Sequence, residues 1–169
     1  MASPPPGFSI RRADQNDMPV LGRLGALLVR QHHGFDGDRF MAPSPGLERG
    51  YADFLRGELD DPEVVVFVAE VAEAAIGYVY AGLEPRSWKE LREPAGFIHD
   101  LVVEETHRGR GAATALLEAA AAWLQARGAP RIMLWSAEMN VAAQRLFARL
   151  GFRRTMIEMT RECAPSDAG

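Results

Sequence analysis

The sequence predicts a single domain of the mixed α/β (α+β) class, and three observations support this. Its 169 residues suit one domain with a substantial core, whereas two domains would each be small. Apolar residues make up 47% of the chain and charged residues 25%, which is ordinary for a globular protein. Strand-like and helix-like segments follow one another in the order βααβββαβαβ, without an interdomain linker. This order predicts a sheet that mixes antiparallel and parallel pairing.

The N-terminal half begins with residues 8–11, which alternate apolar and polar side chains as a strand does. Asp17 followed by Pro19 predicts a helix start, with Asp17 as the capping residue. The helix is supported by apolar residues at helical spacing, namely Leu21, Leu24, Leu27 and Leu28. Residues 34–46 are rich in Gly and Pro and are expected to form a loop. A second helix is expected over residues 47–59.

The middle of the chain contains three runs rich in β-formers. Residues 64–71 and 75–83 are separated by a short turn and predict a hairpin. Residues 96–103 predict a third strand. The alanine-rich segment 112–127 predicts a strong helix, ended by Gly128.

The remaining segments predict a buried strand at residues 131–135, a helix at 140–150 and a last strand at 152–159. The expected domain therefore covers residues 8–160. It would be preceded by a flexible leader, residues 1–7, and followed by a polar tail, residues 161–169.

Composition excludes several classes of function. The net charge of −4 gives no basic field that would draw the chain to nucleic acid. Apolar runs are too short for a membrane span, and the N-terminus lacks the pattern of a secretory signal, so we expect a cytoplasmic protein. Cys163 is the only cysteine, which rules out an intrachain disulfide. No group of residues has the spacing of metal ligands, so no metal site is expected.

The segment 98–117 carries the chemistry, because a strand enters a glycine-containing turn that opens the alanine-rich helix. Unpaired amides at a helix start bind anions, and the helix dipole adds partial positive charge. The glycines permit close backbone approach and the arginines add charge to phosphate oxygens. The residues expected to form this anion site are Arg108, Gly109, Arg110, Gly111, Ala112, Ala113 and Thr114.

Three classes of phosphate-binding loop could use a turn of this kind. A P-loop requires Lys followed by Ser or Thr after its last glycine, and that pair is absent. The dinucleotide fingerprint requires Gly or Ala at position 114, where Thr114 stands, and the first strand of a βαβ unit. A loop that binds the pyrophosphate of an acyl-CoA fits best.

The same residues resemble the general N-acetyltransferase (GNAT) superfamily. The run from Arg108 to Ala113 resembles its Arg/Gln-x-x-Gly-x-Gly/Ala loop, and Asp100 to Val103 resembles the preceding fourth strand. The spacing of Asn140, Ala143, Phe147 and Gly151-Phe152 is similar to the motif Asn-x-x-Ala-x-x-x-Tyr-x-x-x-Gly-Phe. The resemblance spans residues 8–160. It implies a mixed sheet of six to seven strands, with helices on both faces and a cleft where strands four and five splay apart.

The resemblance also implies a transferase that moves an acetyl group from acetyl-CoA to an amine of a small molecule or protein. Main-chain groups of Leu101 and Val103 would pair with the pantetheine arm, and an amide near Leu101 or Val102 would polarise the thioester carbonyl. Asn140 would cap its helix and lie near the pantetheine. A homodimer is a further expectation, because dimers are frequent in the family.

His99 and Asp100 are the candidates for the base that deprotonates the amine. They are the polar pair in an otherwise apolar strand, and burial of polar groups there requires a reason. Simple alternation places His99, Leu101 and Val103 on one face and Asp100 on the other. Only one of the pair would then face the cleft, unless a β-bulge shifts the register. Each residue also has a structural interpretation as a satisfied polar group in the core.

Phe147 departs from the family pattern, because many members have a tyrosine there that protonates the departing thiolate. Phe147 shares a helical face with Ala143 and Leu150, so we expect it to pack in the core beside the cofactor. A thiolate with a pKa of roughly 8.5 needs little acid assistance to leave near neutral pH. The sequence therefore favours an active enzyme over the alternative, a catalytically silent acyl-CoA-binding module. The acceptor itself is not predicted, although the loops at 30–46 and 84–95 are expected to select it.

Overall fold

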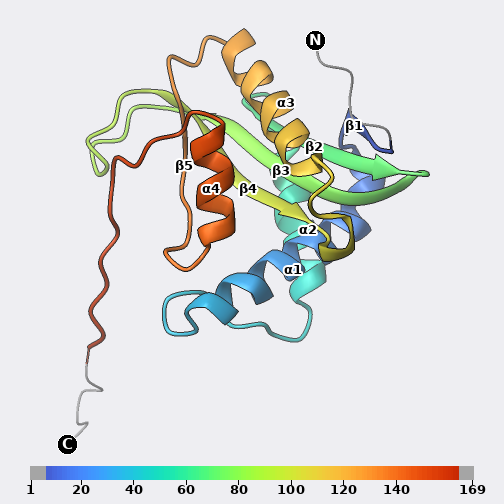
Figure 1. Ribbon diagram of the computed structural model, residues 1–169, viewed down its shortest axis with the longest axis horizontal. Coiled ribbons are helices and arrows are strands. Elements are labelled where there is room, and N and C mark those ends of the chain that lie inside the picture. The colour runs from blue at the N-terminus through green and yellow to red at the C-terminus, as the bar shows by residue number, and fades with distance from the viewer. Residues whose placement is uncertain (1–6, 164–169) are drawn as a thin grey trace, which may run out of the picture.

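The computed structural model describes residues 7–163, which form five strands, four α-helices and two 3₁₀ helices (Figure 1). Most of the expected leader and tail lie outside this range. In chain order the elements are β1 (Ser9–Arg12), η1 (Gln15–Asp17), α1 (Met18–Phe35), α2 (Leu47–Glu58), β2 (Val64–Val71), β3 (Ala74–Glu84), β4 (Ala95–Val103), η2 (Glu105–His107), α3 (Ala112–Ala126), β5 (Ile132–Leu134) and α4 (Val141–Arg149).

The strands form one sheet in the order β1-β2-β3-β4-β5. Strands β1 to β4 pair antiparallel, and the β2–β3 hairpin turns through two residues, Ala72 and Glu73. β5 pairs parallel to β4, because α3 carries the chain back across the sheet between them. The expected mixture of antiparallel and parallel pairing is confirmed.

Helices cover both faces of the sheet, as expected. The long helices α1 and α2 pack on one face, where their side chains join a core with Val66, Tyr78 and Val102. The opposite face carries α3 and α4, whose core includes Val65, Val79 and other alternating residues of the same strands. Figure 1 shows α1 and α2 below the sheet, with α3 and α4 on its other side. No helix between residues 7 and 163 combines the length and hydrophobicity that a membrane span requires.

The expected last strand at residues 152–159 is wrong, and the described part of the chain has five strands rather than six or seven. After α4 the segment runs away from the sheet in an extended path with no strand partner (Figure 1). Its alternating apolar residues therefore remain outside the core, with Met156, Ile157 and Met159 each 72–89% exposed. The pattern suits a strand, but no strand edge in the described part of the chain is paired with it.

Asp17 has a different role from the one expected. Its side chain makes no capping bond to α1; instead it accepts a hydrogen bond from the Asp14 amide and pairs with Arg11 through both carboxylate oxygens, each at 2.8 Å. Asp17 is 7% exposed, and these bonds lower the pKa of its carboxyl, chiefly through Arg11. The pair therefore attaches the start of α1 to β1.

Replacing Asp17 by alanine should lower the free energy of unfolding by about 1 to 3 kcal/mol, because it leaves the Asp14 amide without its partner and Arg11 with Glu70 as its remaining ion pair. Because the folded-state pKa lies below the unfolded value near 3.9, this stabilisation is complete above that pH and disappears as the pH falls through the folded pKa. Denaturant unfolding of both proteins at pH 7 and pH 3 measures it. The matched control is Asp53→Ala, which removes an exposed pair with Arg56 and should change stability by less than about 1 kcal/mol.

Candidate active site

The sheet opens between β4 and β5, as the sequence predicted. Their pairing covers only Gly96 to Ile98 on β4 and Ile132 to Leu134 on β5. Beyond Ile98 the edge of β4 is unpaired on that side. The Glu104 amide donates a hydrogen bond to the Ile76 carbonyl on β3. The backbone groups of successive residues alternate between the two edges of a strand, so those of Leu101 and Val103 point to the open edge. An extended ligand can add to these groups as a further strand would.

A β-bulge decides where the two candidate bases lie. Opposite β3, Tyr80 pairs with Asp100 while Ala81 pairs with Ile98, which leaves His99 as the extra residue. The bulge brings His99 and Asp100 onto the same face, the one that α1 and α2 cover. Simple alternation, which separated them, is therefore wrong at this point.

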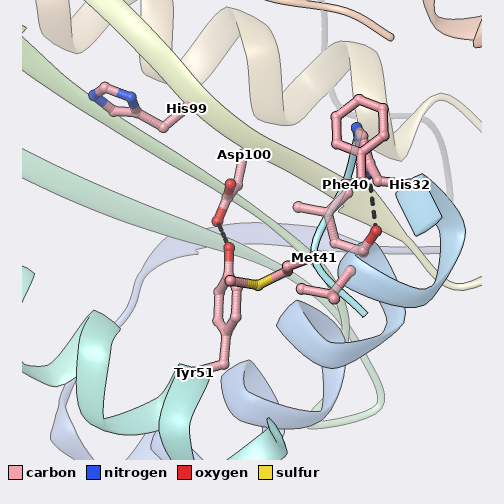
Figure 2. A pocket seen from close by; sticks show the side chains of 8 residues that line it. His32, Phe40, Met41, Tyr51, His99 and Asp100 are labelled. Carbon is pink, nitrogen blue, oxygen red and sulfur yellow. Dashed lines mark hydrogen bonds between the residues drawn. The ribbon is translucent and has the colours of Figure 1, made fainter. Parts of the chain in front are cut away.

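The Asp100 carboxylate is held by two tyrosines. Its Oδ2 accepts hydrogen bonds from the hydroxyls of Tyr51 on α2, at 2.5 Å, and Tyr78 on β3, at 2.8 Å. Figure 2 shows the first of these bonds across the pocket. The other carboxylate oxygen, Oδ1, makes no hydrogen bond to residues 7–163. In the same range no side-chain oxygen that lacks a hydrogen bond is fully buried, so Oδ1 must be partly exposed. One carboxylate oxygen is thus fixed by the protein and the other remains accessible.

The position of Tyr51 depends on a glycine in the facing helix. Gly25 of α1 lies under the Tyr51 ring, and a Cβ at that position would come within 2.0 Å of ring atom Cδ1. Any larger residue would therefore push the ring aside. Gly25 lets α1 and α2 approach closely enough for the Tyr51 hydroxyl to reach β4.

Burial dominates the electrostatics of this cluster. Removal from water raises the pKa of Asp100 above its ordinary value, against the lowering effect of the two tyrosine hydrogen bonds. The pKa values of Tyr51 and Tyr78 are raised for the same reason, and their proximity to Asp100 raises them further. The tyrosines thus remain protonated donors, and the carboxylate is a stronger base than an exposed aspartate.

Asp100 lines a cavity of about 230 Å³. Apart from Asp100, Tyr51 and His99, the lining residues come from α1 and the loop that follows it: Leu28, Val29, His32, Phe40 and Met41. His32 donates from Nδ1 to the Leu28 carbonyl at 2.9 Å in the tautomer that this contact requires, and its ring packs edge-on against Phe40 (Figure 2). The loop at 30–46 therefore contributes to this pocket, as expected, whereas Trp88 in the second loop is 80% exposed and does not line it.

His99 is fixed in a different environment. Its ring stacks between Tyr80, at 4.7 Å, and Phe97, at 5.0 Å, and its Nε2 lies 3.0 Å from a carboxylate oxygen of Glu84. In Figure 2 it lies on the other side of Asp100 from His32 and Phe40. His99 thus forms a wall of the site, while the accessible carboxylate oxygen belongs to Asp100.

The expected anion site has the backbone that such a site requires. Gly109 and Gly111 have φ values of +75° and +89°, which glycine adopts at little cost. Gly111 caps α3, so the amides of Ala112, Ala113 and Thr114 stand at the helix start. Arg110 makes no ion pair or side-chain hydrogen bond within residues 7–163.

Arg108 holds the turn in place. Its Nε donates to the carbonyl of Val103, at the end of β4, at 3.0 Å. This bond connects the open edge of the strand to the loop before α3. The terminal guanidinium nitrogens make no hydrogen bond in the described part of the chain and remain free for an anion.

The helix α4 supplies the other two candidate residues. Asn140 caps it, its side-chain oxygen accepting from the Ala143 amide at 3.2 Å, as the sequence predicted. Phe147 is 9% exposed in the core beneath α3 and α4, with its ring edge-on to Phe152. The prediction that Phe147 packs as a core residue is confirmed.

Sequence reasoning missed the two tyrosines that hold Asp100. Tyr51 lies in a helix and Tyr78 in a β-rich run, where each is explained equally well as core. The available signal was the alternation of Tyr78 and Tyr80 on one face of β3, the face that α1 and α2 bury. Among residues 7–163 no group of acidic, histidine or cysteine side chains is arranged to hold a metal ion.

Comparison with known proteins identifies the family. The model of the acetyltransferase (GNAT) family matches residues 27–152, about three quarters of the chain. The chain belongs to the GNAT acetyltransferase family. The match includes the open edge of β4, the anion site and the α4 motif, so the resemblance inferred from the sequence is confirmed.

The similar proteins support the same assignment. An uncharacterized N-acetyltransferase of Methanocaldococcus jannaschii is 30% identical over 145 residues, which cover 86% of this chain but only 60% of that protein. A second uncharacterized N-acetyltransferase, of Archaeoglobus fulgidus, is 28% identical over 87% of this chain and 94% of its own length. Among solved structures, aminoglycoside N-acetyltransferase AAC(6')-Iy in complex with CoA has a TM-score of 0.74 at 19% identity, covering 92% of this chain and 94% of that one. At that identity the likeness shows the GNAT fold.

Proposed function

We propose that this GNAT protein is an active N-acetyltransferase that moves an acetyl group from acetyl-CoA to a primary amine, with Asp100 as the general base. The observation that carries the proposal is the Asp100 carboxylate at the open edge of β4. One of its oxygens is bonded by two tyrosines and the other is accessible from a cavity. A carboxylate so placed can remove the ammonium proton before the amine attacks.

Acetyl-CoA fits the neighbouring elements. The pantetheine arm would bond to the open backbone groups of Leu101 and Val103, and the pyrophosphate would lie on the amides after Gly111, with Arg108 and Arg110 nearby. The Leu101 or Val102 region would supply the amide that polarises the thioester carbonyl. Asn140 and Phe147, on α4, would lie against the pantetheine arm.

In the proposed reaction the neutral amine attacks the thioester carbonyl directly, so no acyl-enzyme forms. The new C–N bond replaces the C–S bond, and CoA leaves as a thiolate. Asp100 takes the proton removed from the ammonium before attack, and the second nitrogen proton, lost as the amide forms, passes to the departing thiolate or to water. The protein contributes by positioning the amine and by excluding water around the carboxylate. A cytoplasmic location and a homodimer remain predictions from the sequence.

The second candidate is a module that binds acyl-CoA without turnover, and Phe147 is the observation that favours it. Both candidates require acetyl-CoA binding, whereas only the enzyme requires that CoA thiol be released when an amine is present. Incubation of the purified protein with acetyl-CoA and a panel of amines and peptides, with thiol release followed by a chromogenic disulfide reagent, separates them. Tight binding of acetyl-CoA without release on any acceptor would identify the silent module.

The substitution Phe147→Tyr tests the importance of the missing acid. Because a thiolate leaves readily near neutral pH, we expect turnover to rise less than about tenfold, with the affinity for acetyl-CoA similar. Steady-state kinetics and calorimetric titration with acetyl-CoA measure the two quantities. A rise of several hundredfold would mean that proton donation to the thiolate limits the natural protein.

A further inference from the structure

The charge of the pocket limits which amines it accepts, given the proposed function. The lining residues include Asp100 but no arginine or lysine, and the basic side chains among them are the rings of His32 and His99. The Arg39 guanidinium lies over the ring of Phe40 and is paired with Glu158. His32 Nδ1 is engaged by the Leu28 carbonyl, and His99 Nε2 by the Glu84 carboxylate, so these two ring nitrogens already have partners within the protein. Glu58 and Glu84 add negative charge around Tyr80 and His99 on the same face of the sheet. A cationic group is therefore favoured here, and an anionic group beside it has no partner.

The remainder of the wall is apolar. Leu28 and Val29 form one side, and Phe40 and Met41 from the following loop form another. The volume of about 230 Å³ lies below the 300 Å³ or more of a site for drug-sized ligands. Such a space suits a body of one ring or a short branched chain rather than a sugar with several hydroxyl groups.

We propose that the acceptor is a compact primary amine with an apolar body and no carboxylate. Its ammonium would lie on Oδ1 of Asp100, and its body would fill the cavity between Leu28, Val29, Phe40 and Met41. Tyr51 and Tyr78 hold the carboxylate so that this free oxygen faces the amine. The selective feature of the pocket is that its lining holds no arginine or lysine that would accept an α-carboxylate.

Two compounds that differ only in that carboxylate test the inference. We expect kcat/KM for 2-phenylethylamine to exceed that for phenylalanine by at least about a hundredfold, because the amino acid must bring an unpaired carboxylate next to Asp100. Kanamycin, a bulky polar polyamine, should be poorer still. CoA release with each acceptor, at saturating acetyl-CoA, gives the ratios.

A variant at the rim of the cavity provides a second readout. Met41 is 66% exposed, so Met41→Ala does not threaten the fold. It should raise KM for 2-phenylethylamine about fivefold or more while leaving KM for ethylamine nearly unchanged, because only the larger body reaches the methionine. Trp88→Ala, which removes an exposed ring outside the pocket, is the matched control and should change neither value.

The outcomes separate this inference from the proposed function. Preference for phenylalanine or kanamycin over 2-phenylethylamine would overturn the acceptor class and leave the transferase intact. If Met41→Ala changed KM equally for ethylamine and 2-phenylethylamine, the apolar body of the acceptor would not bind in this cavity. Binding of acetyl-CoA without turnover of any acceptor would overturn both.

Discussion

Replacing Asp100 by asparagine will reduce kcat/KM for amine acetylation by about 10² to 10⁴, the range that general base catalysis supplies. The amide keeps an oxygen that can accept from Tyr51 and Tyr78, so the pocket should keep its shape while losing its proton acceptor. Affinity for acetyl-CoA should not change, because the Asp100 side chain lies on the α1–α2 face and the expected pantetheine contacts are main-chain groups. Steady-state kinetics with the best amine, together with calorimetric titration of acetyl-CoA, measure both effects.

The pH profile separates a base from a structural carboxylate. Because burial raises the pKa of Asp100, the acidic limb of kcat/KM in the natural protein should lie above the ordinary pKa of aspartate, and activity should rise as the carboxyl ionises. Asp100→Asn should lack that limb. A variant that kept the limb and lost activity only through altered binding of the amine would assign Asp100 to positioning.

His99→Phe is the matched control for the choice of base. Phenylalanine retains the stacking between Tyr80 and Phe97 and removes both ring nitrogens. We expect a much smaller loss than for Asp100→Asn, because His99 lies in the wall beside Glu84. A loss as large as that of Asp100→Asn, with a shifted pH limb, would transfer the base role to His99.

Gly111→Asp should weaken acetyl-CoA binding by about 10² to 10³. The φ of +89° costs a non-glycine residue roughly 1 to 2 kcal/mol, and a carboxylate at the start of α3 repels the phosphates and competes for the same amides. Losing one charge-assisted hydrogen bond adds about 1.5 to 3 kcal/mol, and each 1.4 kcal/mol corresponds to a tenfold change in Kd. Titration with acetyl-CoA and with CoA measures the loss.

Gly111→Ala distinguishes strain from charge at the same position. Alanine adds the backbone strain but no carboxylate, so its effect on Kd should be smaller than that of aspartate. Thermal unfolding of both variants checks that the domain remains folded. Unchanged affinity in Gly111→Asp would mean that the pyrophosphate does not bind at this helix start.

The local patterns predicted most elements because they depend on short-range chemistry. The alanine-rich run has a high helix propensity of its own. A turn must precede this helix, and Gly111 in that turn adopts the left-handed conformation that glycine permits. The β2–β3 hairpin follows from two adjacent β-rich runs. The helix start at Asn140 follows from the capping preference of asparagine, and the structure confirms it.

The errors occurred where partners outside the local helix or strand pattern decide. Asp17 follows the pattern of a capping residue, yet Arg11 on a neighbouring element takes its carboxylate. Residues 152–159 alternate as a strand does, yet a strand requires an edge to pair with, and among residues 7–163 this segment pairs with none.

The sequence by itself determined the family and the mixed sheet and predicted the anion site, because the glycine turn with its helix start and the α4 motif are each patterns of a few neighbouring residues. Only the tertiary structure decided how His99, Asp100 and the two tyrosines are arranged. The bulge at His99 depends on the register against Tyr80, and it places Asp100 on the face of α1 and α2. Tyr51 reaches Asp100 from 49 positions away, across a contact that Gly25 permits. Contacts between such distant residues leave no local pattern, since they arise from the packing of helices on the sheet.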